Sequence, residues 1–378
     1  MTERQRVVEQ VEQRVRQRAV PKPPPKTRKE GFFLPTGSTM LNLAMTDRID
    51  GGWPMGKINT LPGKSTAGKT VLVLSTFAEA CLDPRFDNYL LIYDDVERRC
   101  DFNLDKLFSP LTSRLITPSG LLYADLRGNE DKSGISNTIE DMEITLTTLA
   151  KKGQPFIYVA DSLDSFSTDE EVAKELLKAV AAAKSKDAAD KVAQAHAARK
   201  AGIIHRILRN VNGLIANTKS LLIITQQLKQ KIDAKPFERK WTTNGGEGPY
   251  FYSQVRPFMT RVGIRKECGC EVGTDTEVIM DKNSTTGKLR NIRFSIYNEL
   301  GIDDIGSMVD FLREQKVWEI KGSWVDAPEF DLREQGWANL TRAVENSGKI
   351  DKLKRLVQRA WDNREDDIKR ALDRKPRY

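Results

Sequence analysis

Residues 63–70 read Gly63-Lys64-Ser65-Thr66-Ala67-Gly68-Lys69-Thr70, which fits the P-loop pattern G-x-x-x-x-G-K-[ST]. Glycine permits backbone conformations that a Cβ forbids, so successive N–H groups can turn toward phosphate oxygens. Lys69 is expected to reach the β- and γ-phosphates, and Thr70 to help hold Mg²⁺. A glycine-rich turn without a ligand is the alternative. The stretch predicts a phosphate-binding loop for a nucleotide and Mg²⁺.

The sequence on either side of this loop supports the same interpretation. Lys57–Leu61 has the apolar character of a short strand that enters the loop, and Val71–Leu82 that of a buried helix that leaves it. Pro84 predicts the end of that helix, because proline cannot continue the hydrogen-bond ladder. From Gly31 onward, apolar runs alternate with amphipathic segments as βαβ units do. We therefore expect an α/β core with a mostly parallel central sheet.

Polar side chains follow three further apolar runs. Tyr89–Tyr93 and Phe156–Ala160 each end in acidic residues, and Leu221–Thr225 ends in Gln226 and Gln227. Ligands of open parallel sheets bind beyond the carboxyl ends of the strands, so these endings should converge on the nucleotide. Asp161 is then expected to anchor Mg²⁺, with a helix N-cap as its alternative role.

The acidic run Asp94-Asp95-Val96-Glu97 offers a base for hydrolysis. A carboxylate beside the γ-phosphate can orient and polarise the attacking water. Glu97 is our candidate. Asp94 and Asp95 remain competitors, because the pattern alone does not choose among three carboxylates.

Composition sets the wider limits. The chain has 378 residues, 39% of them apolar, a formal charge of +8 and a pI near 9.1. This length allows one large α/β domain with appendages, and the charge favours a polyanionic partner. No apolar run of about 18 residues and no secretory signal occurs, so we expect a cytoplasmic protein. Four scattered cysteines fit reduced thiols. Cys268-Gly269-Cys270 lacks a second pair for zinc.

The two ends differ from the core, and we expect domains at 1–30, 31–301 and 302–378. Thr2–Ala19 carries a narrow stripe of three valines on a charged helix, followed by a stiff proline-rich spacer at 21–26. This segment is expected to be an oligomerisation arm, with a disordered basic tail as the alternative. After Ile302 we expect a small C-terminal α/β domain with a helix from Lys352 to Leu372. Its core is expected to contain Trp318, Trp324 and Trp337.

Two segments are candidates for contact with DNA. Asp169–Lys200 has the composition of a long, largely exposed helix, for which a solvated face is as good an interpretation as DNA contact. Residues 228–247 interleave cations with aromatics, which suits single-stranded DNA, where cations hold phosphates and rings stack on bases. A surface loop without a ligand is the alternative. The candidates here are Lys229, Lys231, Lys235, Phe237, Arg239, Lys240, Trp241, Thr242, Thr243, Asn244, Gly245 and Gly246. The loop begins beside the nucleotide at Gln227, so hydrolysis state could order it.

Between Phe33 and Trp361 the chain resembles RecA-type recombinases. The similarity rests on linked motifs: Thr36-Gly37-Ser38 and Gly51-Gly52-Trp53-Pro54-Met55-Gly56-Lys57-Ile58 before the P-loop, Asp95-Val96-Glu97-Arg98-Arg99-Cys100-Asp101, Asp161-Ser162, Gln227, and Thr242-Thr243-Asn244-Gly245-Gly246 with Phe251-Tyr252-Ser253-Gln254-Val255-Arg256. The resemblance implies a helical filament on single-stranded DNA, in the nucleoid or in the cytoplasm of a phage-infected host. It also implies ATP bound between subunits, and homologous pairing with strand exchange in recombination and repair.

The resemblance also implies individual roles. It selects Glu97 as base, makes Gln227 the sensor of the γ-phosphate, and adds Asp101 as a nucleotide contact. Lys282 would reach ATP from the adjacent subunit, with Phe251 at the same interface, and Arg199 and Lys200 would belong to the first DNA loop. Single-strand-binding and mediator proteins are further expected partners.

This chain departs from the family in places. Lys282-Asn283-Ser284 keeps one of two lysines that act across the interface, Leu104 stands where a tyrosine would stack on adenine, and the acidic C-terminal tail is absent. Slower or less filament-dependent hydrolysis is expected, because a trans cation is lost. Two alternatives stay open: a recombinase paralogue acting as an ATP-switched mediator or scaffold, and a ring helicase with the same core.

Overall fold

The computed structural model describes residues 31–97, 104–108, 136–172, 186–230 and 241–372, and no side chains at 104–105, 186–197 or 229–230. Residues 33–378 form one compact unit, and residues 1–32 form another. The expected N-terminal helix lies outside the described residues.

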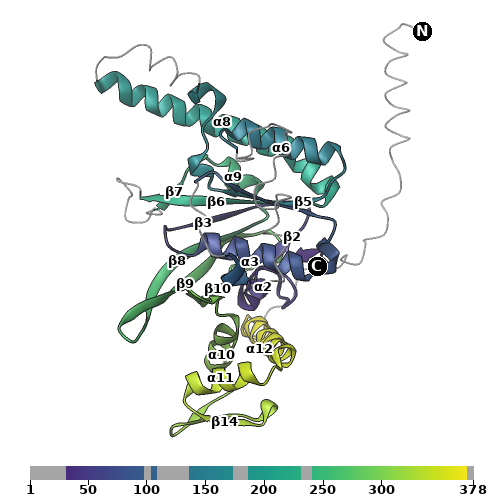
Figure 1. Cartoon of the computed structure of the whole chain (residues 1–378), viewed down its shortest axis with the longest axis vertical. Coiled ribbons are helices and arrows are strands. Elements are labelled where there is room, and N and C mark those ends of the chain that lie inside the picture. Colours follow the sequence, from purple (N-terminus) through teal and green to yellow (C-terminus); the bar gives the residue numbers. More distant parts are fainter. Residues whose placement is uncertain (1–30, 98–103, 109–135, 173–185, 231–240, 373–378) are drawn as a thin grey trace, which may run out of the picture. The chain divides into compact units, whose positions relative to one another are not determined.

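A nine-stranded sheet organises the described part of the compact unit (Figure 1). Its strands run in the order β11-β10-β9-β8-β3-β6-β5-β4, and β7 pairs with β6 outside this path. The strands are β3 (Lys57–Gly63), β4 (Leu90–Asp95), β5 (Phe156–Asp161), β6 (Leu221–Gln230), β7 (Trp241–Thr243), β8 (Val255–Glu267), β9 (Cys270–Asn283), β10 (Asn291–Tyr297) and β11 (Gly301–Ile302).

The half of the sheet from β8 to β4 is parallel, and the half from β8 to β11 is antiparallel. The expected α/β core with a mostly parallel sheet is therefore confirmed. The direction changes at β8, where a hairpin replaces the helical crossovers that parallel strands require. At its tip the two turn residues, Cys268 and Gly269, have φ of 51° and 81°, as a tight hairpin turn needs.

Helices cover both faces of the parallel half (Figure 1). On one face α6 (Ile139–Lys151) and α8 (Lys186–Thr218) pack on alternate residues of β5 and β6, among them Phe156, Tyr158 and Leu222. On the other face α3 (Lys69–Leu82) buries a continuous apolar run, and α2 (Thr39–Thr46) lies beside it. Apolar residues at a spacing of two in the strands and about 3.6 in the helices thus lie on facing surfaces and are buried together.

Helix α8 ends well beyond the expected Lys200. From Ile204 onward its apolar residues at helical spacing are buried against the sheet, including Ile207, Val211 and Ile215. The segment predicted to be exposed helix, Asp169–Lys200, therefore continues into a helical segment that packs on the core. Residues 173–185, in the first part of that stretch, lie outside the described residues.

The remaining chain adds shorter elements. They are β1 (Phe33–Leu34) paired with β2 (Trp53–Pro54), α4 (Leu104–Phe108), α9 (Gly248–Tyr252), α10 (Asp304–Glu314), α11 (Trp337–Asn346), α12 (Ile350–Ala371), the sheet β12 (Ile320–Lys321), β13 (Trp324–Ala327) and β14 (Leu332–Gln335), and 3₁₀ turns at Pro84–Phe86, Leu163–Ser165 and Pro328–Phe330. None of the described helices is long and apolar enough to cross a membrane.

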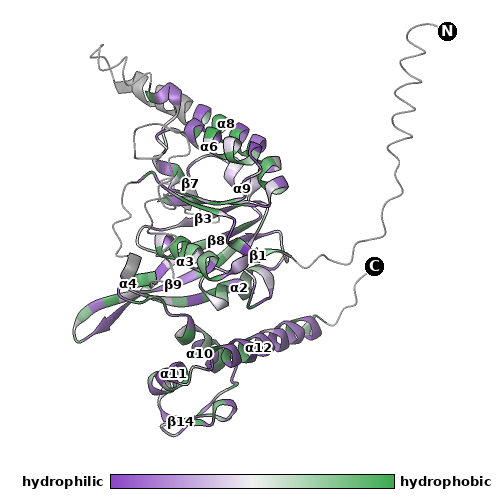
Figure 2. Cartoon of the chain, turned by 45° about the vertical axis from the view of Figure 1, so that its right-hand side comes forward, coloured by the Kyte–Doolittle hydropathy of each residue, from purple (hydrophilic) through white to green (hydrophobic). Residues whose placement is uncertain are grey.

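Helix α12 is largely hydrophilic on the side seen in Figure 2 and buries one stripe from Leu353 to Glu365, which includes Trp361. Trp318 is buried, as expected of a core tryptophan. The expectation for Trp324 is wrong, since 44% of its surface is exposed, and Trp337 is half-buried. Arg333 lies over the Trp324 ring at 5.5 Å and shields it in place of a core.

Candidate nucleotide and nucleic-acid site

The P-loop links the end of β3 to the start of α3. Gly68, the residue before the helix, has a φ of 86°, and a Cβ there would lie 2.1 Å from Ile296 Cδ1. Glycine suits this position because an L-residue is strained at this φ, and an added Cβ would also displace the end of the Ile296 side chain. The resulting helix N-terminus is the kind of site where backbone N–H groups and the helix dipole favour an anion.

Lys69 bends back into the loop. Its Nζ donates to the carbonyl oxygens of Gly63 and Lys64, both at 3.0 Å. Burial lowers its pKa, while the nearby charges of Asp161, Glu97 and Asp164 act in the opposite direction. The ammonium is thus held inside the loop among carboxylates, where a phosphate would be its natural counter-ion.

Asp161, at the end of β5, collects hydroxyl groups from three other elements. Its Oδ2 accepts from Thr70 Oγ1 at 2.9 Å and from Tyr93 OH at 2.6 Å, and its Oδ1 accepts from Thr225 Oγ1 at 2.5 Å. The strand ends therefore converge as expected. The Thr70–Asp161 pair fits Mg²⁺, which takes a protein hydroxyl and carboxylate together with waters and phosphate oxygens. In the described part of the chain, no three His, Cys, Asp or Glu side chains gather as a metal site.

Glu97 lies just beyond β4 and faces β5 and β6. Its Oε1 accepts from Gln227 Nε2 at 2.6 Å and from Ser162 Oγ, whose peptide bond to Asp161 is cis. Asp94 is bound differently: Oδ1 accepts from the Ser136 amide at 2.9 Å, and Oδ2 from Tyr158 OH. The geometry gives Asp94 a structural task and leaves Glu97 at the strand ends beside Lys69's loop. Asp101 lies outside the described residues.

The side chains of Gln226 and Gln227, both in β6, bind residues of other elements. Gln226 reaches Asn244, the residue that follows β7. Gln226 Nε2 donates to the Asn244 carbonyl at 2.8 Å, and Gln226 Oε1 accepts from Arg256 Nη1 at 2.6 Å. The Gln227 amide donates to Asp164 Oδ2 at 2.7 Å. Arg256, only 5% exposed, also donates to Thr60, Thr243 and Asp281. This network fixes both ends of the candidate DNA loop to the sheet.

The expected start of that loop at Gln227 differs from the structure. Strand β6 continues to Gln230 because it pairs with β7, with Leu228 opposite Thr243 and Gln230 opposite Trp241. Lys229 pairs with Thr242 through its backbone. The other candidates Lys231, Lys235, Phe237, Arg239 and Lys240 lie outside the described residues.

The described exit of the loop is closely shaped. Gly245 and Gly246 have φ of 94° and 68°, and a Cβ on Gly245 would lie 2.9 Å from Leu163. Trp241 remains 36% exposed, and Lys64 Nζ lies 4.8 Å from its ring centroid. The P-loop and the candidate DNA segment therefore touch.

The remaining candidate residues have other described partners. Arg199 Nη1 pairs with Glu170 at 2.5 Å, and Lys200 donates to the Phe166 carbonyl and lies 3.8 Å from Glu171. Lys282 Nζ donates to the carbonyl oxygens of Tyr250 and Phe251, both at 2.9 Å, at the end of α9. Burial and then the charge of Arg256 lower the pKa of Lys282.

Phe251 is 67% exposed, and Tyr250 is 43% exposed beneath the Lys282 ammonium at 5.2 Å. Tyr250, Phe251 and Lys282 therefore form an exposed patch of two aromatic rings and one cation.

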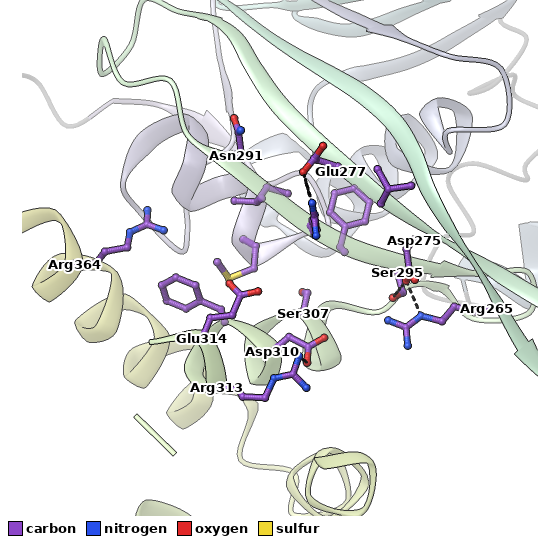
Figure 3. A pocket seen from close by; sticks show the side chains of 16 residues that line it. Arg265, Asp275, Glu277, Asn291, Ser295, Ser307, Asp310, Arg313, Glu314 and Arg364 are labelled. Atoms are coloured by element: carbon purple, nitrogen blue, oxygen red, sulfur yellow. Dashed lines mark hydrogen bonds and ion pairs between the residues drawn. The ribbon is translucent and has the colours of Figure 1, made fainter. Parts of the chain in front are cut away.

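A crevice of about 620 Å³ lies elsewhere, between β8–β10 and α10 (Figure 3). Its described lining contains no P-loop residue. Its four arginines are already paired with acids. The pairs are Arg265 with Asp275 at 2.6 Å, Arg293 with Glu277 at 2.8 Å, Arg313 with Asp310 at 3.2 Å, and Arg364 with Glu365 at 3.2 Å. A nucleotide would have to displace these carboxylates, so the crevice is the weaker candidate for phosphate binding.

Sequence reasoning missed several residues of the site. Tyr93 and Thr225 bind Asp161, Ser162 binds Glu97, and Asp164 binds Gln227. A signal was present for the first two, because each is a polar residue at the carboxyl end of an apolar strand. Their partner could not be inferred without the order of the strands.

Comparison with known proteins agrees with this architecture. Residues 157–303 match the model of the RecA N-terminal domain family. Protein RecA of Ectopseudomonas oleovorans is 26% identical over 326 residues, covering 86% of this chain and 82% of the relative. Protein RecA of Geobacter metallireducens is 24% identical over 291 residues, covering 77% and 74% respectively. The chain is thus distantly similar to RecA-type proteins over most of its length.

Proposed function

We propose that this protein is an ATP-dependent recombinase that forms helical filaments on single-stranded DNA and catalyses homologous pairing and strand exchange. The observation that carries the proposal is the hydrogen bond from Gln227 to Glu97. It joins the carboxylate suited to hydrolysis with the strand that leads directly into the candidate DNA loop. Similarity to the RecA-type family supports the same function.

In the proposed hydrolysis Glu97 orients the attacking water and accepts its proton. The P-loop amides and Lys69 hold the phosphates, and Asp101 contacts the nucleotide. Thr70 and Asp161 would hold Mg²⁺, which supplies charge neutralisation at the phosphate oxygens when bound. Gln227 reports the state of the phosphate end of the site to the loop, because its side chain and its backbone bind different acids, Glu97 and Asp164.

In the proposed DNA contact the cations and rings of the 228–246 segment bind phosphates and bases of a single strand. The formal charge of +8 supports a polyanionic partner. Arg199 and Lys200 would have to leave Glu170 and Glu171 to join in. Homologous duplex DNA is the second proposed substrate, and single-strand-binding and mediator proteins are proposed partners.

Assembly is proposed to use the N-terminal segment 1–30 as an arm, with Phe251 and Lys282 facing the adjacent ATP site. The core would be 31–301, and 302–378 would form the C-terminal domain. A mediator or scaffold role is the second candidate. Ser284, which stands in place of a second trans lysine, favours it.

Strand exchange between a single-stranded circle and a homologous linear duplex tests the proposal, with ATP and with a non-hydrolysable analogue. Negative-stain images of the same mixtures provide the second measurement. Joint molecules with DNA-bound filaments are expected. Filaments without exchange would favour the scaffold, and closed rings would favour a helicase.

A further inference from the structure

A cation of the phosphate-binding loop covers an aromatic ring of the candidate DNA segment. Lys64 Nζ lies 4.8 Å from the centroid of the Trp241 ring, within the range of a cation–π contact. Lys64 is the second residue of the P-loop pattern, and Trp241 opens β7. The two residues are far apart in sequence and touch because β6, which pairs with β7, is also the parallel neighbour of β3.

Both residues are anchored by their backbones. The Lys64 amide donates to the Met259 carbonyl of β8 at 3.2 Å, and the Lys64 carbonyl accepts from Lys69 at 3.0 Å. Trp241 pairs with Gln230 in the β6–β7 ladder. The backbones are therefore fixed, and the contact depends on the flexible side chain of Lys64.

From this arrangement we infer that Lys64 is a nucleotide-controlled cover of Trp241, which leaves the ring when ATP occupies the P-loop and exposes it to a DNA base. The inference rests on the proposed function, because it assigns a regulatory contact to the same site. A bound nucleotide would offer Lys64 a phosphate as an alternative partner to the Trp241 ring. A hydrogen bond between an ammonium and a phosphate is among the strong ones, whereas a cation over a partly exposed ring is weaker.

The Lys64 contact affects DNA binding because it covers one face of the Trp241 ring. Stacking of a base needs an open aromatic face, and with Lys64 in place one face of Trp241 is covered. Release of Lys64 by ATP should strengthen binding of single-stranded DNA about two- to fivefold, as expected for a cation–π contact at an exposed site. Linkage requires the reverse effect as well, so single-stranded DNA should tighten ATP binding by the same factor.

The test compares Lys64→Met with the full-length wild type. Methionine keeps the length and apolar stem of lysine and removes its charge. We would measure the dissociation constant for oligo(dT) with and without a non-hydrolysable ATP analogue. The ratio compared is the constant without the analogue divided by the constant with it. The ratio should fall about two- to fivefold in Lys64→Met. In a Trp241→Leu background the substitution at Lys64 should leave the ratio unchanged.

The protein offers a matched control. Arg333 lies 5.5 Å from the ring centroid of Trp324, so Arg333→Met removes a similar contact in the sheet β12–β14. This variant should keep the wild-type ratio. A Trp324→Phe background also removes the other clearly exposed indole, since Trp53, Trp318 and Trp361 are buried and Trp337 is half-buried. In that background the analogue should increase acrylamide quenching of tryptophan emission, and Lys64→Met should abolish the increase.

An unchanged ratio in Lys64→Met, or an equal fall in Arg333→Met, would overturn the inference while the proposed function stands. A wild-type protein that binds neither the analogue nor oligo(dT) would overturn both. The two failures are therefore distinguishable.

Discussion

Gln227 Nε2 lies 2.6 Å from Glu97 Oε1, so a residue in the second half of β6 binds the carboxylate just beyond β4 across the intervening strand β5. Gln227 is three residues from the end of β6, which runs on to Gln230 at the edge of the candidate DNA loop. Movement of Glu97 toward a nucleotide would therefore act on the loop through one hydrogen bond.

Replacing Gln227 by Met removes the amide and keeps the size of the side chain. ATP should still bind, because Gln227 does not belong to the P-loop, but stimulation of hydrolysis by single-stranded DNA should fall. Coupling between sites is usually worth about 5- to 150-fold, and we expect a loss in this range. Steady-state ATPase assays with and without oligo(dT) measure it. Gln254→Met, the same change at a residue between α9 and β8, is the control and should retain stimulation.

Replacing Glu97 by Gln should leave nucleotide binding intact and slow turnover about 10²- to 10⁴-fold, the usual contribution of a general base. The amide keeps one oxygen that can accept from Gln227, so the fold should persist. Equilibrium binding of a fluorescent ATP analogue and single-turnover hydrolysis separate the two effects. Turnover at the wild-type rate would mean that Asp94 or Asp95 is the base.

Replacing Gly68 by Ala should abolish nucleotide binding. The new Cβ would meet Ile296 Cδ1 at 2.1 Å on a backbone with a φ of 86°. Gly153→Ala is the matched control, since Gly153 has a φ of 69° but no heavy atom within 4 Å of an added Cβ. Both changes should cost about 1–2 kcal/mol of left-handed strain. Titration with the ATP analogue should show a loss at Gly68 alone, and equal losses at both sites would show that backbone strain, not the contact, matters.

Glu365 on α12 predicts a pH dependence of stability. Hydrogen bonds from Arg290 at 2.6 and 2.7 Å, together with Lys288 at 2.9 Å, lower its pKa from 4.5 to about 2. A carboxyl with a depressed pKa in the folded state stabilises the fold fully above its unfolded value, and this contribution disappears as the pH falls through about 2.

Glu365→Gln should therefore lower the free energy of unfolding at pH 7 by about 1.5–3 kcal/mol, as loss of hydrogen bonds to a charged group does. The gap to the wild type should narrow below pH 4.5 and be smallest near pH 2. Urea titrations across this range measure the gap. Asp366→Asn, on the exposed side of the same helix, should give no comparable gap; a gap at Glu365 that stays constant with pH would contradict the assignment.

The sequence allowed the core of the fold to be predicted because local patterns there agree with long-range packing. The P-loop, the strands around Tyr93, Tyr158 and Ile223, and the helix to Leu82 each carry their own period and end signals. No local signal in the sequence gives the order of the strands, so the sequence does not identify the hydroxyl partners of Asp161.

The predictions for the end of β6 and for Trp324 were wrong because contacts with distant parts of the chain determine both. Strand β6 extends past Gln227 because β7 returns to pair with it, a contact that no local signal at Leu228 could reveal. Trp324 lies on the exposed side of a small sheet and is shielded by Arg333 rather than buried. Large aromatic residues are buried on average, and an arginine on the neighbouring strand can take the place of a core.

The assignment of Lys282 to a neighbouring ATP site can be tested by mixing two inactive variants. Within one chain Lys282 Nζ is bound by the carbonyl oxygens of Tyr250 and Phe251, next to an exposed aromatic surface. If it acts in trans, Lys282→Met leaves an intact Glu97 on the same subunit, and Glu97→Gln leaves an intact Lys282. In a head-to-tail filament built from equal amounts of the two variants, about a quarter of the interfaces would combine an intact Lys282 with an intact Glu97. ATPase activity should therefore return to about a quarter of the wild-type value. If Lys282 acts within its own chain, every subunit lacks one of the two groups and the mixture should stay as inactive as its components.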